Sequence, residues 1–195
     1  MRLLELGCGE GPCARLVGRR DLCWIGLEAR VECLGALRSN LSGGAIVDIE
    51  RLDRLPHGFD AVLAADTFEH LNDYHAALAR VHEALREGGR LFVSIPNVAH
   101  LYVRLAILFG RFPYADRGIL DRTHRRFFTR ASLRDELRQA GFAIVRETVS
   151  TVPLPLAFPR LPRWLLEALG AGLELVTRLL PTLLGYQLLV EARRL

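Results

Sequence analysis

Lysine is absent from this 195-residue sequence, and all 26 basic residues are arginine. In a chain rich in leucine and alanine, so uniform a choice reflects a GC-rich coding background rather than selection for phosphate binding. The formal charge of +4 and the isoelectric point near 9.2 therefore do not indicate a nucleic-acid-binding surface. We expect no nucleic-acid partner.

Cysteine is scarce and unevenly placed: the four cysteines are Cys8, Cys13, Cys23 and Cys33, all within the first 33 residues. They form no C-x-x-C pair and have no histidine cluster nearby, so the pattern favours neither a zinc site nor a disulfide framework. We expect no metal site, and we expect four small, buried or half-buried thiols in a reducing compartment.

Long uninterrupted apolar runs are also lacking. The chain opens without the basic and apolar regions of a signal peptide, which predicts a cytoplasmic location. The most apolar segment, 164–180, has charged residues at helical spacing in or beside it, whereas a membrane-spanning helix needs about 20 mostly apolar residues. Two interpretations stay open: a helix that packs in a core or a homodimer, and an interfacial helix that contacts lipid or a lipid-linked acceptor as a peripheral membrane contact.

The composition, 50% hydrophobic and 25% charged, is that of one globular domain with a sizeable core. Short apolar runs alternate with segments of helical periodicity, which predicts an α/β fold with a doubly wound parallel sheet. The predicted strands are 22–27, 45–48, 59–65, 90–96 and 142–149, after a first strand that ends at residue 6; the predicted helices are 12–19, 31–39, 74–85, 98–109 and 132–140. Ser132 is predicted to cap the last of these helices.

Three glycines at alternate positions, Gly7, Gly9 and Gly11, follow the first strand directly. Such a loop points backbone N–H groups at one spot and lets a ligand approach without meeting a Cβ atom, which is typical of a nucleotide-type cofactor site. The spacing differs from the G-x-G-x-x-G of dinucleotide-binding loops. Glu5 and Glu10 make the loop acidic, which disfavours a pyrophosphate and suits a cationic ligand.

Glu28 stands at the end of the second predicted strand. A carboxylate there is placed to accept hydrogen bonds from both hydroxyls of a ribose. This feature fits NAD and S-adenosylmethionine equally well, and a solvent-exposed glutamate at a strand end is the simpler alternative.

Residues 5–11 read E-x-G-x-G-x-G and resemble motif I of the class I S-adenosylmethionine-dependent methyltransferases, whose cofactor carries a sulfonium charge and no phosphate. Residues 59–71 resemble the motif IV region of the same family, in which the strand end faces the transferred methyl and an E-H-L/V tripeptide opens the next turn. Residues 118–129 resemble a signature of a subgroup near the type 11 and type 23 methyltransferases. The two motifs occur in the family's order, and a dehydrogenase has no reason to carry the second.

This resemblance implies a Rossmann-like, seven-stranded sheet that is mostly parallel, with an antiparallel last strand at 186–192. It implies a single domain over 1–195: a cofactor-binding half, 1–96, and an acceptor-side half, 97–195, with an apolar helical insertion at about 158–181. Asp48 would meet the adenine amino group, and Ile49 would pack near its ring. The residues expected to bind S-adenosylmethionine are Glu5, Gly7, Cys8, Gly9, Gly11, Glu28, Asp48, Ile49, Ala65 and Asp66.

The implied reaction is methyl transfer from S-adenosylmethionine to a small-molecule, glycan or lipid-linked acceptor, expected at oxygen. A hydroxyl acceptor needs a base within hydrogen-bond reach, and His70 and His124 are the first candidates, with Asp121 as an orienting or alternative acid. A histidine in a loop is also a common structural hydrogen-bonder, so both interpretations stay open.

One departure from the family concerns the start of the chain. Family members carry a helical segment before motif I, whereas this sequence opens on the first strand. The alternatives are a truncated start and an unusually open acceptor side. A second function therefore stays in view, that of a cofactor-binding but catalytically silent partner of another enzyme, and an NAD-linked oxidoreductase is a distant third.

Overall fold

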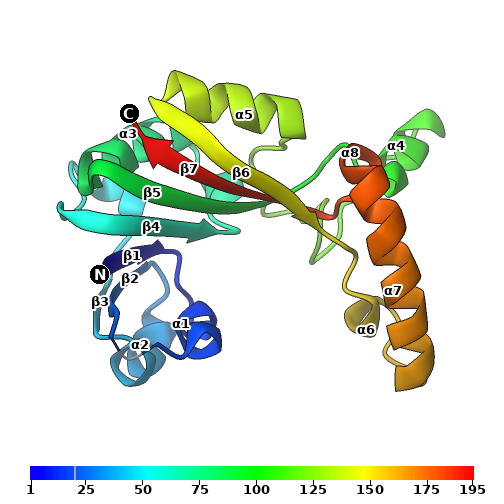
Figure 1. Cartoon of the computed structure of the whole chain (residues 1–195), viewed down its shortest axis with the longest axis horizontal. Coiled ribbons are helices and arrows are strands. Elements are labelled where there is room, and N and C mark those ends of the chain that lie inside the picture. The colour runs from blue at the N-terminus through cyan, green and yellow to red at the C-terminus, as the bar shows by residue number, and fades with distance from the viewer. Residues whose placement is uncertain (20) are drawn as a thin grey trace.

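The computed structural model describes residues 1–19 and 21–195, and within them seven strands form one sheet in the order β3-β2-β1-β4-β5-β7-β6 (Figure 1). The strand β7 runs antiparallel to its neighbours β5 and β6, and all other neighbouring pairs are parallel. The predicted doubly wound sheet with an antiparallel last strand is thus confirmed. The strands are β1 Arg2–Leu6, β2 Cys23–Glu28, β3 Gly43–Ile46, β4 Phe59–Ala65, β5 Leu85–Pro96, β6 Phe142–Ser150 and β7 Gln187–Arg194.

Helices connect these strands, and the predicted helical segments all appear, with ends that differ by a few residues. The α-helices are α1 Pro12–Val17, α2 Leu34–Asn40, α3 Tyr74–Ala84, α4 Leu101–Leu108, α5 Arg130–Gln139, α6 Leu154–Ala157, α7 Arg163–Leu179 and α8 Pro181–Leu184. The short 3-10 turns are η1 Val31–Cys33, η2 Ile49–Arg51 and η3 Phe68–His70. Of the helices described, none has the length and apolar character that crossing a membrane would require.

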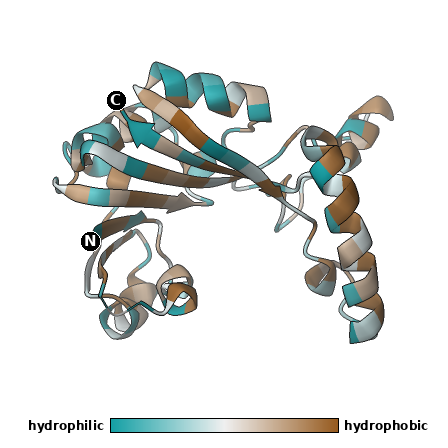
Figure 2. Cartoon of the chain, in the orientation of Figure 1, coloured by the Kyte–Doolittle hydropathy of each residue, from teal (hydrophilic) through white to brown (hydrophobic). Residues whose placement is uncertain are grey.

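Both faces of the central strands are buried, because successive side chains of a strand point to opposite faces of the sheet. Val62 of β4 belongs to the large core under α3 and α5, whereas its neighbour Ala61 belongs to a smaller cluster that includes Ala14 of α1. Figure 2 shows the resulting apolar colour along the middle strands. Burial on both sides explains why β4 reads as a continuous apolar run in the sequence.

The start of α5 differs from the prediction. Ser132 is not the N-cap; Thr129 is, and its Oγ1 accepts a hydrogen bond from the backbone N–H of Ser132 at 3.2 Å. In return Ser132 Oγ accepts the N–H of Thr129 at 2.9 Å. This reciprocal capping box satisfies two otherwise unpaired donors, which a helix beginning after Ser132 would leave open.

The four thiols also differ from the prediction in one case. Cys8 and Cys33 are buried and Cys13 is half-buried, but Cys23 is exposed. Cys23 is the first residue of β2, and the alternation of the strand turns its neighbour Trp24, rather than Cys23, into the core.

A carboxylate on β6 fastens α5 to the sheet. Glu147 Oε2 accepts a hydrogen bond from Arg130 Nε at 2.8 Å, and Arg134 makes a second, two-pronged contact with the same carboxylate. The Glu147 side chain is only 8% exposed. Burial by itself would raise its pKa, but the hydrogen bonds from Arg134 and Arg130 outweigh burial and lower it.

We expect Glu147→Gln to lower the free energy of unfolding by about 2 kcal/mol near neutral pH, because two half-buried guanidinium groups lose their counter-charge. The folded-state pKa of Glu147 lies below the unfolded value, so this stabilisation is present above pH 4.5 and is lost as pH falls through the folded-state pKa. Urea denaturation of both proteins at neutral and acidic pH measures the difference. The exposed Glu83→Gln is the control, and an equal effect of the Glu147 substitution at both pH values would contradict the expectation.

Candidate active site

A cavity of about 540 Å³ lies at the carboxyl ends of β1, β2 and β4, the edge where parallel α/β sheets bind ligands. Several residues that the sequence assigns to the cofactor line this cavity together, although they come from separate strands. They are Gly7, Glu28, Asp48, Ile49 and Asp66, and the predicted catalytic residue His70 joins them.

The glycine loop adopts the left-handed backbone that glycine permits. Gly7, Gly9 and Gly11 have φ values of 62°, 52° and 75°. A Cβ atom on Gly7 would also lie only 3.0 Å from Thr67 Oγ1, so a side chain there would press on the turn after β4. The glycines therefore set both the path of the loop and its close approach to the cavity.

Glu28 closes one side of the cavity as a buried, hydrogen-bonded carboxylate. Its Oε2 accepts the N–H of Gly9 at 2.7 Å, and its Oε1 accepts the N–H and the Nε–H of Arg30, both at 3.0 Å. Burial would raise the pKa of Glu28, but these hydrogen bonds outweigh it and lower the pKa. The carboxylate is thus charged near neutral pH, and Oε2 keeps a lone pair for a further donor.

Glu5 and Cys8 lie behind the glycine loop rather than in the cavity wall. Glu5 is 2% exposed, and its Oε2 accepts the indole N–H of Trp24 at 2.7 Å. Cys8 donates its backbone N–H to Leu27 at 3.2 Å, and burial raises the pKa of its thiol to about 12. Both residues support the glycine loop on the side away from the cavity. Because the thiol of Cys8 stays protonated near neutral pH, we assign this residue a packing role.

Two other predicted cofactor residues also shape the cavity from outside its wall. Gly11 donates its N–H to the carbonyl of Cys8 at 2.8 Å, which closes the loop before α1. Ala65 is the last residue of β4, and its carbonyl accepts the hydroxyl of Thr67 at 3.1 Å.

The far end of the cavity is an apolar slot with one carboxylate. Val47 and the buried Ile49 form part of its wall, and Asp48 stands between them in sequence. Asp48 Oδ1 accepts the N–H of Glu50 at 3.0 Å, which caps the η2 turn and fixes the carboxylate.

Asp66 begins the turn after β4 at the opposite end. Of the non-glycine residues that the structure describes, it alone has a positive φ, 49°. A left-handed aspartate costs free energy and is held there by its surroundings. Burial raises the pKa of Asp66, and its side chain lies 3.5 Å from Ser94 Oγ.

The three predicted catalytic residues meet next to Asp66. The loop that precedes α5 is tied to the η3 turn, because the carbonyl of Glu69 accepts the N–H groups of Arg125 and Arg126 at 2.7 and 3.1 Å. This contact brings the rings of His124 and His70 to a centroid separation of 4.9 Å.

The third residue, Asp121, holds the tip of the same loop. Its Oδ1 accepts the hydroxyl of Thr123 at 2.6 Å, and Thr123 Oγ1 in turn lies 3.3 Å from His70 Nδ1. Asp121 therefore reaches His70 through Thr123. The tertiary fold joins residues that are more than fifty positions apart in the chain.

Glu69 is a further residue beside the cavity that its own position in the sequence does not single out. Its side chain is 1% exposed, neither carboxylate oxygen has a hydrogen-bond partner, and burial raises its pKa to about 8. Glu69 is part of the E-H-L tripeptide, and in the sequence this tripeptide is only a family signature. Arg30 and Thr123, which line the cavity, are not singled out either, because exposed polar residues in loops give no periodic signal.

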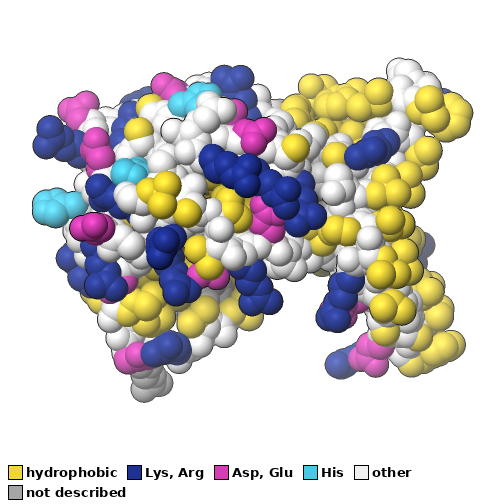
Figure 3. Space-filling view, turned by 45° about the horizontal axis from the view of Figure 1, so that its top comes forward, with side chains coloured by type: hydrophobic (Ala, Val, Ile, Leu, Met, Phe, Trp, Pro, Cys, Tyr) yellow, Lys and Arg dark blue, Asp and Glu magenta, His cyan; other side chains and the backbone are white. Residues whose placement is uncertain are grey.

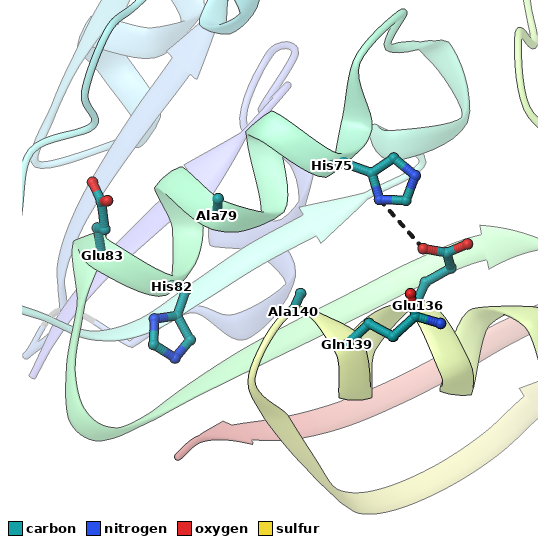
Figure 4. A pocket seen from close by; sticks show the side chains of 7 residues that line it. All are labelled: His75, Ala79, His82, Glu83, Glu136, Gln139 and Ala140. Atoms are coloured by element: carbon teal, nitrogen blue, oxygen red, sulfur yellow. Dashed lines mark ion pairs between the residues drawn. The ribbon is translucent and has the colours of Figure 1, made fainter.

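A second cavity, of about 470 Å³, lies between α3 and α5 (Figure 4). His75 of α3 points toward Glu136 of α5, with 3.3 Å between Nδ1 and Oε2, and His82 lies farther along α3. None of the residues of the glycine loop or of the turn after β4 lines it. We therefore place the functional site at the strand ends.

The strand order and the loop-and-carboxylate cavity define a Rossmann-like fold of the methyltransferase type. The family model described as "Methyltransferase domain" (type 23) matches residues 1–147. The chain thus belongs to this methyltransferase-domain family, and the resemblance inferred from the motifs is confirmed.

Curated relatives are ubiquinone biosynthesis O-methyltransferases. The mitochondrial protein of Rattus norvegicus is 27% identical over 120 residues, which are 56% of this chain and 35% of the relative. The protein of Azorhizobium caulinodans is 30% identical over 150 residues, 73% of this chain and 58% of the relative. The chain thus spans about a third to three fifths of the length of these relatives.

Solved structures agree in fold. A methyltransferase from Archaeoglobus fulgidus described as SAM dependent (SAM being S-adenosylmethionine) has a TM-score of 0.65 at 18% identity, covering 99% of this chain and 86% of that one. Magnesium protoporphyrin IX methyltransferase from Synechocystis PCC 6803, solved with bound SAH, has a TM-score of 0.66 at 16% identity, covering 99% and 74%. At these identities the likeness shows the fold alone.

Proposed function

We propose that this chain transfers a methyl group from S-adenosylmethionine to an oxygen of a small acceptor. The observation that carries the proposal is that one cavity is lined by Gly7 and Glu28 and also by Asp66 and His70. The first pair suits the nucleoside of the cofactor, and the second lies where a transferred group would be. Residues 1–96 would then form the cofactor-binding half of a single domain, and 97–195 the acceptor side.

The residues present fit this cofactor in charge and shape. Glu28 accepts the ribose hydroxyls, the slot beside Ile49 takes the adenine, and Asp48 accepts from its amino group. Asp66 and Glu28 place carboxylates around the cavity, which favours a sulfonium and disfavours a diphosphate. When bound, S-adenosylmethionine supplies an electrophilic methyl with a neutral leaving group, so the chain has mainly to align the reactants and exclude water.

The acceptor hydroxyl is proposed to lose its proton at the cluster of His70, His124 and Asp121. Burial lowers the pKa of His124, so its imidazole is neutral near physiological pH. His124 Nδ1 lies 3.1 Å from the carbonyl of Ile119, which orients the ring. The cluster thus offers a polar, oriented contact for a hydroxyl beside the methyl-transfer position.

Isothermal titration of the chain with S-adenosylmethionine and with its demethylated product tests the cofactor. We expect both to bind, and a folded protein that binds neither would contradict the proposal. Hydroxylated aromatic acceptors with and without a prenyl tail, assayed for methyl incorporation, then test the reaction. Binding of the cofactor without transfer to any of them would favour the alternative, a silent partner of another enzyme.

A prenyl-type tail is included because the acceptor side of the molecule exposes a large apolar surface. Large side chains on α4, α6 and α7 face solvent (Figure 3), and arginines are interspersed among them. They include Leu108 and Phe109 at 75%, Leu156 at 81%, Trp164 at 69% and Leu179 at 72% exposure. A surface of this size marks a contact site, and the arginines suit anionic headgroups. We infer that α7 lies on a lipid surface from which the acceptor is taken.

We expect Trp164→Ser combined with Leu179→Ser to lower partitioning onto vesicles of phosphatidylglycerol and phosphatidylcholine at least about tenfold, because each large apolar side chain contributes about 1.5–3 kcal/mol when buried. Co-sedimentation measures the partitioning. Leu16→Ser on α1, 87% exposed and remote from α7, is the matched control. If the wild-type protein does not bind these vesicles and sediments as a dimer, the apolar surface is instead the interface with a second copy of the chain.

A further inference from the structure

A third cavity, of about 340 Å³, lies where α7 meets the end of β6 and the start of α5 (Figure 1). Its wall carries two arginines, Arg130 and Arg178, and the hydroxyl-bearing Thr177. None of the residues that line it also lines the cofactor cavity. We propose that this cavity binds a phosphate-type anion.

The side chain of Thr177 is the first argument. Among the described residues of α7, Thr177 alone is buried, at 2% exposure. Its Oγ1 has no hydrogen-bond partner among the described residues. A threonine inside a helix commonly bonds to the carbonyl four residues earlier, and a buried hydroxyl without any partner costs free energy. An anion in the cavity would accept a hydrogen bond from this hydroxyl.

The two guanidinium groups are the second argument. Arg130 donates its Nε–H to Glu147 at 2.8 Å. Arg178 donates from Nη2 to Glu174 at 2.5 Å. Among the hydrogen bonds of the described residues, neither guanidinium makes a second one, so each keeps several N–H donors. A guanidinium presents these donors as a planar fork that matches two oxygens of a phosphate.

The carboxylates beside the cavity do not cancel the positive charge. Glu147 is shared by Arg130 and Arg134, which leaves this group of three with one positive charge. Arg178 and Glu174 form an i,i+4 pair on α7, with side chains 73% and 57% exposed. An exposed pair of this kind is weak, so Arg178 can turn to an anion at small cost. The local sum of one positive charge favours an anion over a cation.

A bound anion would connect elements that are distant in the sequence. Arg130 begins α5, whereas Thr177 and Arg178 lie in the last turn of α7. Most of the large side chains of α7 are left in solvent, so a contact through the anion would fix this helix against the rest of the chain. A ligand that binds only the folded chain also stabilises it in proportion to its concentration. The inference does not depend on methyl transfer.

The test uses the full chain in a phosphate-free buffer. Calorimetric titration with sodium phosphate, compared with sodium chloride at equal ionic strength, is expected to show a single phosphate bound per chain. We expect Arg178→Gln to weaken phosphate binding about tenfold or more, because a charged hydrogen-bond donor is lost. Thr177→Val is expected to weaken it about fivefold. Without phosphate this variant should be no less stable than the wild type, since its hydroxyl has no partner to lose.

Arg163→Gln is the matched control. Arg163 forms a similar exposed i,i+4 pair with Glu167 at the other end of α7, and it does not line the cavity. We expect it to bind phosphate as the wild type does. Glu174→Gln is expected to strengthen phosphate binding about threefold, because it releases Arg178 from its exposed pair.

Two sources of the phosphate group are separated by a second titration with vesicles of phosphatidylglycerol. If inorganic phosphate does not bind but Thr177→Val lowers vesicle binding, a lipid headgroup fills the cavity. If Thr177→Val and Arg178→Gln change neither titration, the site is overturned. Equal losses in Arg163→Gln and Arg178→Gln would overturn it too, because they would indicate a general effect of charge. Binding of S-adenosylmethionine, measured on the same samples, tests the proposed function separately.

Discussion

Glu28→Gln is expected to weaken the binding of S-adenosylmethionine about 30-fold, a loss of about 2 kcal/mol, because hydrogen bonds to a charged acceptor contribute about 1.5–3 kcal/mol each. The amide replaces one carboxylate oxygen with a donor, and that donor would face either the ribose or the N–H of Gly9, which now lies 2.7 Å from Oε2. Isothermal titration measures the loss. The demethylated product should lose the same factor, since it carries the same ribose.

Glu32→Gln is the matched control, because Glu32 is exposed in the neighbouring η1 turn and makes no side-chain hydrogen bond among those described. It removes the same charge from the same region. If Glu32→Gln weakened binding as much as Glu28→Gln, general electrostatic attraction rather than ribose recognition would explain the effect. If neither changed the affinity, the assignment of Glu28 to the cofactor would be wrong.

Asn97→Ala is expected to lower the free energy of unfolding by about 3 kcal/mol, since each buried polar group left unpaired costs about 1–3 kcal/mol. Asn97 is fully buried at the end of β5. Its Nδ2 donates to the carbonyls of Thr182 and Gly185 at 3.0 and 2.8 Å, and its Oδ1 accepts the N–H of Ala99 at 3.0 Å. The substitution removes the partner of all three groups, of which Gly185 is buried and Ala99 is half-buried.

The same residue joins the sheet to the acceptor side, because its side chain connects the end of β5 with α8, with the residue that follows α8 and with the turn before α4. We therefore expect methyl transfer to fall further than cofactor affinity in Asn97→Ala. Denaturant titration, calorimetry and a methyl-transfer assay measure the three quantities. Gln139→Ala, at an exposed glutamine of α5 that makes no side-chain hydrogen bond among those described, is the control and should change stability by no more than about 0.5 kcal/mol. A loss of similar size in both variants would contradict the buried-junction argument.

Much of the cofactor side was predictable because its signals are local. The glycine spacing needs only a strand followed by a tight loop, and the left-handed φ of Gly7, Gly9 and Gly11 is what that spacing predicts. Glu28 is the last residue of β2, so strand periodicity alone places it at the carboxyl edge. That Glu28 lies beside Gly9 follows in turn from parallel pairing of β1 with β2. The assignment of these residues to S-adenosylmethionine stays a prediction.

Glu5 shows where local reasoning ends. Motif I places it with the cofactor, yet its carboxylate bonds to Trp24 under the loop and does not line the cavity. The side chains of neighbouring strands decide what a strand side chain contacts. Here Trp24 of β2 places its indole beside Glu5 and donates a hydrogen bond to it. Ser132 is similar, since its role depends on Thr129 three residues earlier rather than on its own preference for a cap.

By itself the sequence determined the doubly wound sheet, the glycine loop, the carboxylate at the end of β2 and the turn after β4, because each depends on periodicity or on neighbours a few residues apart. Only the tertiary structure decided that Glu69 is buried without partners, that His124 meets His70, and that α7 leaves its apolar side in solvent. These depend on loops docking across the molecule, as when Arg125 and Arg126 bond to the carbonyl of Glu69. Such contacts have no period and no fixed spacing in the chain, so the acceptor side is where the sequence says least.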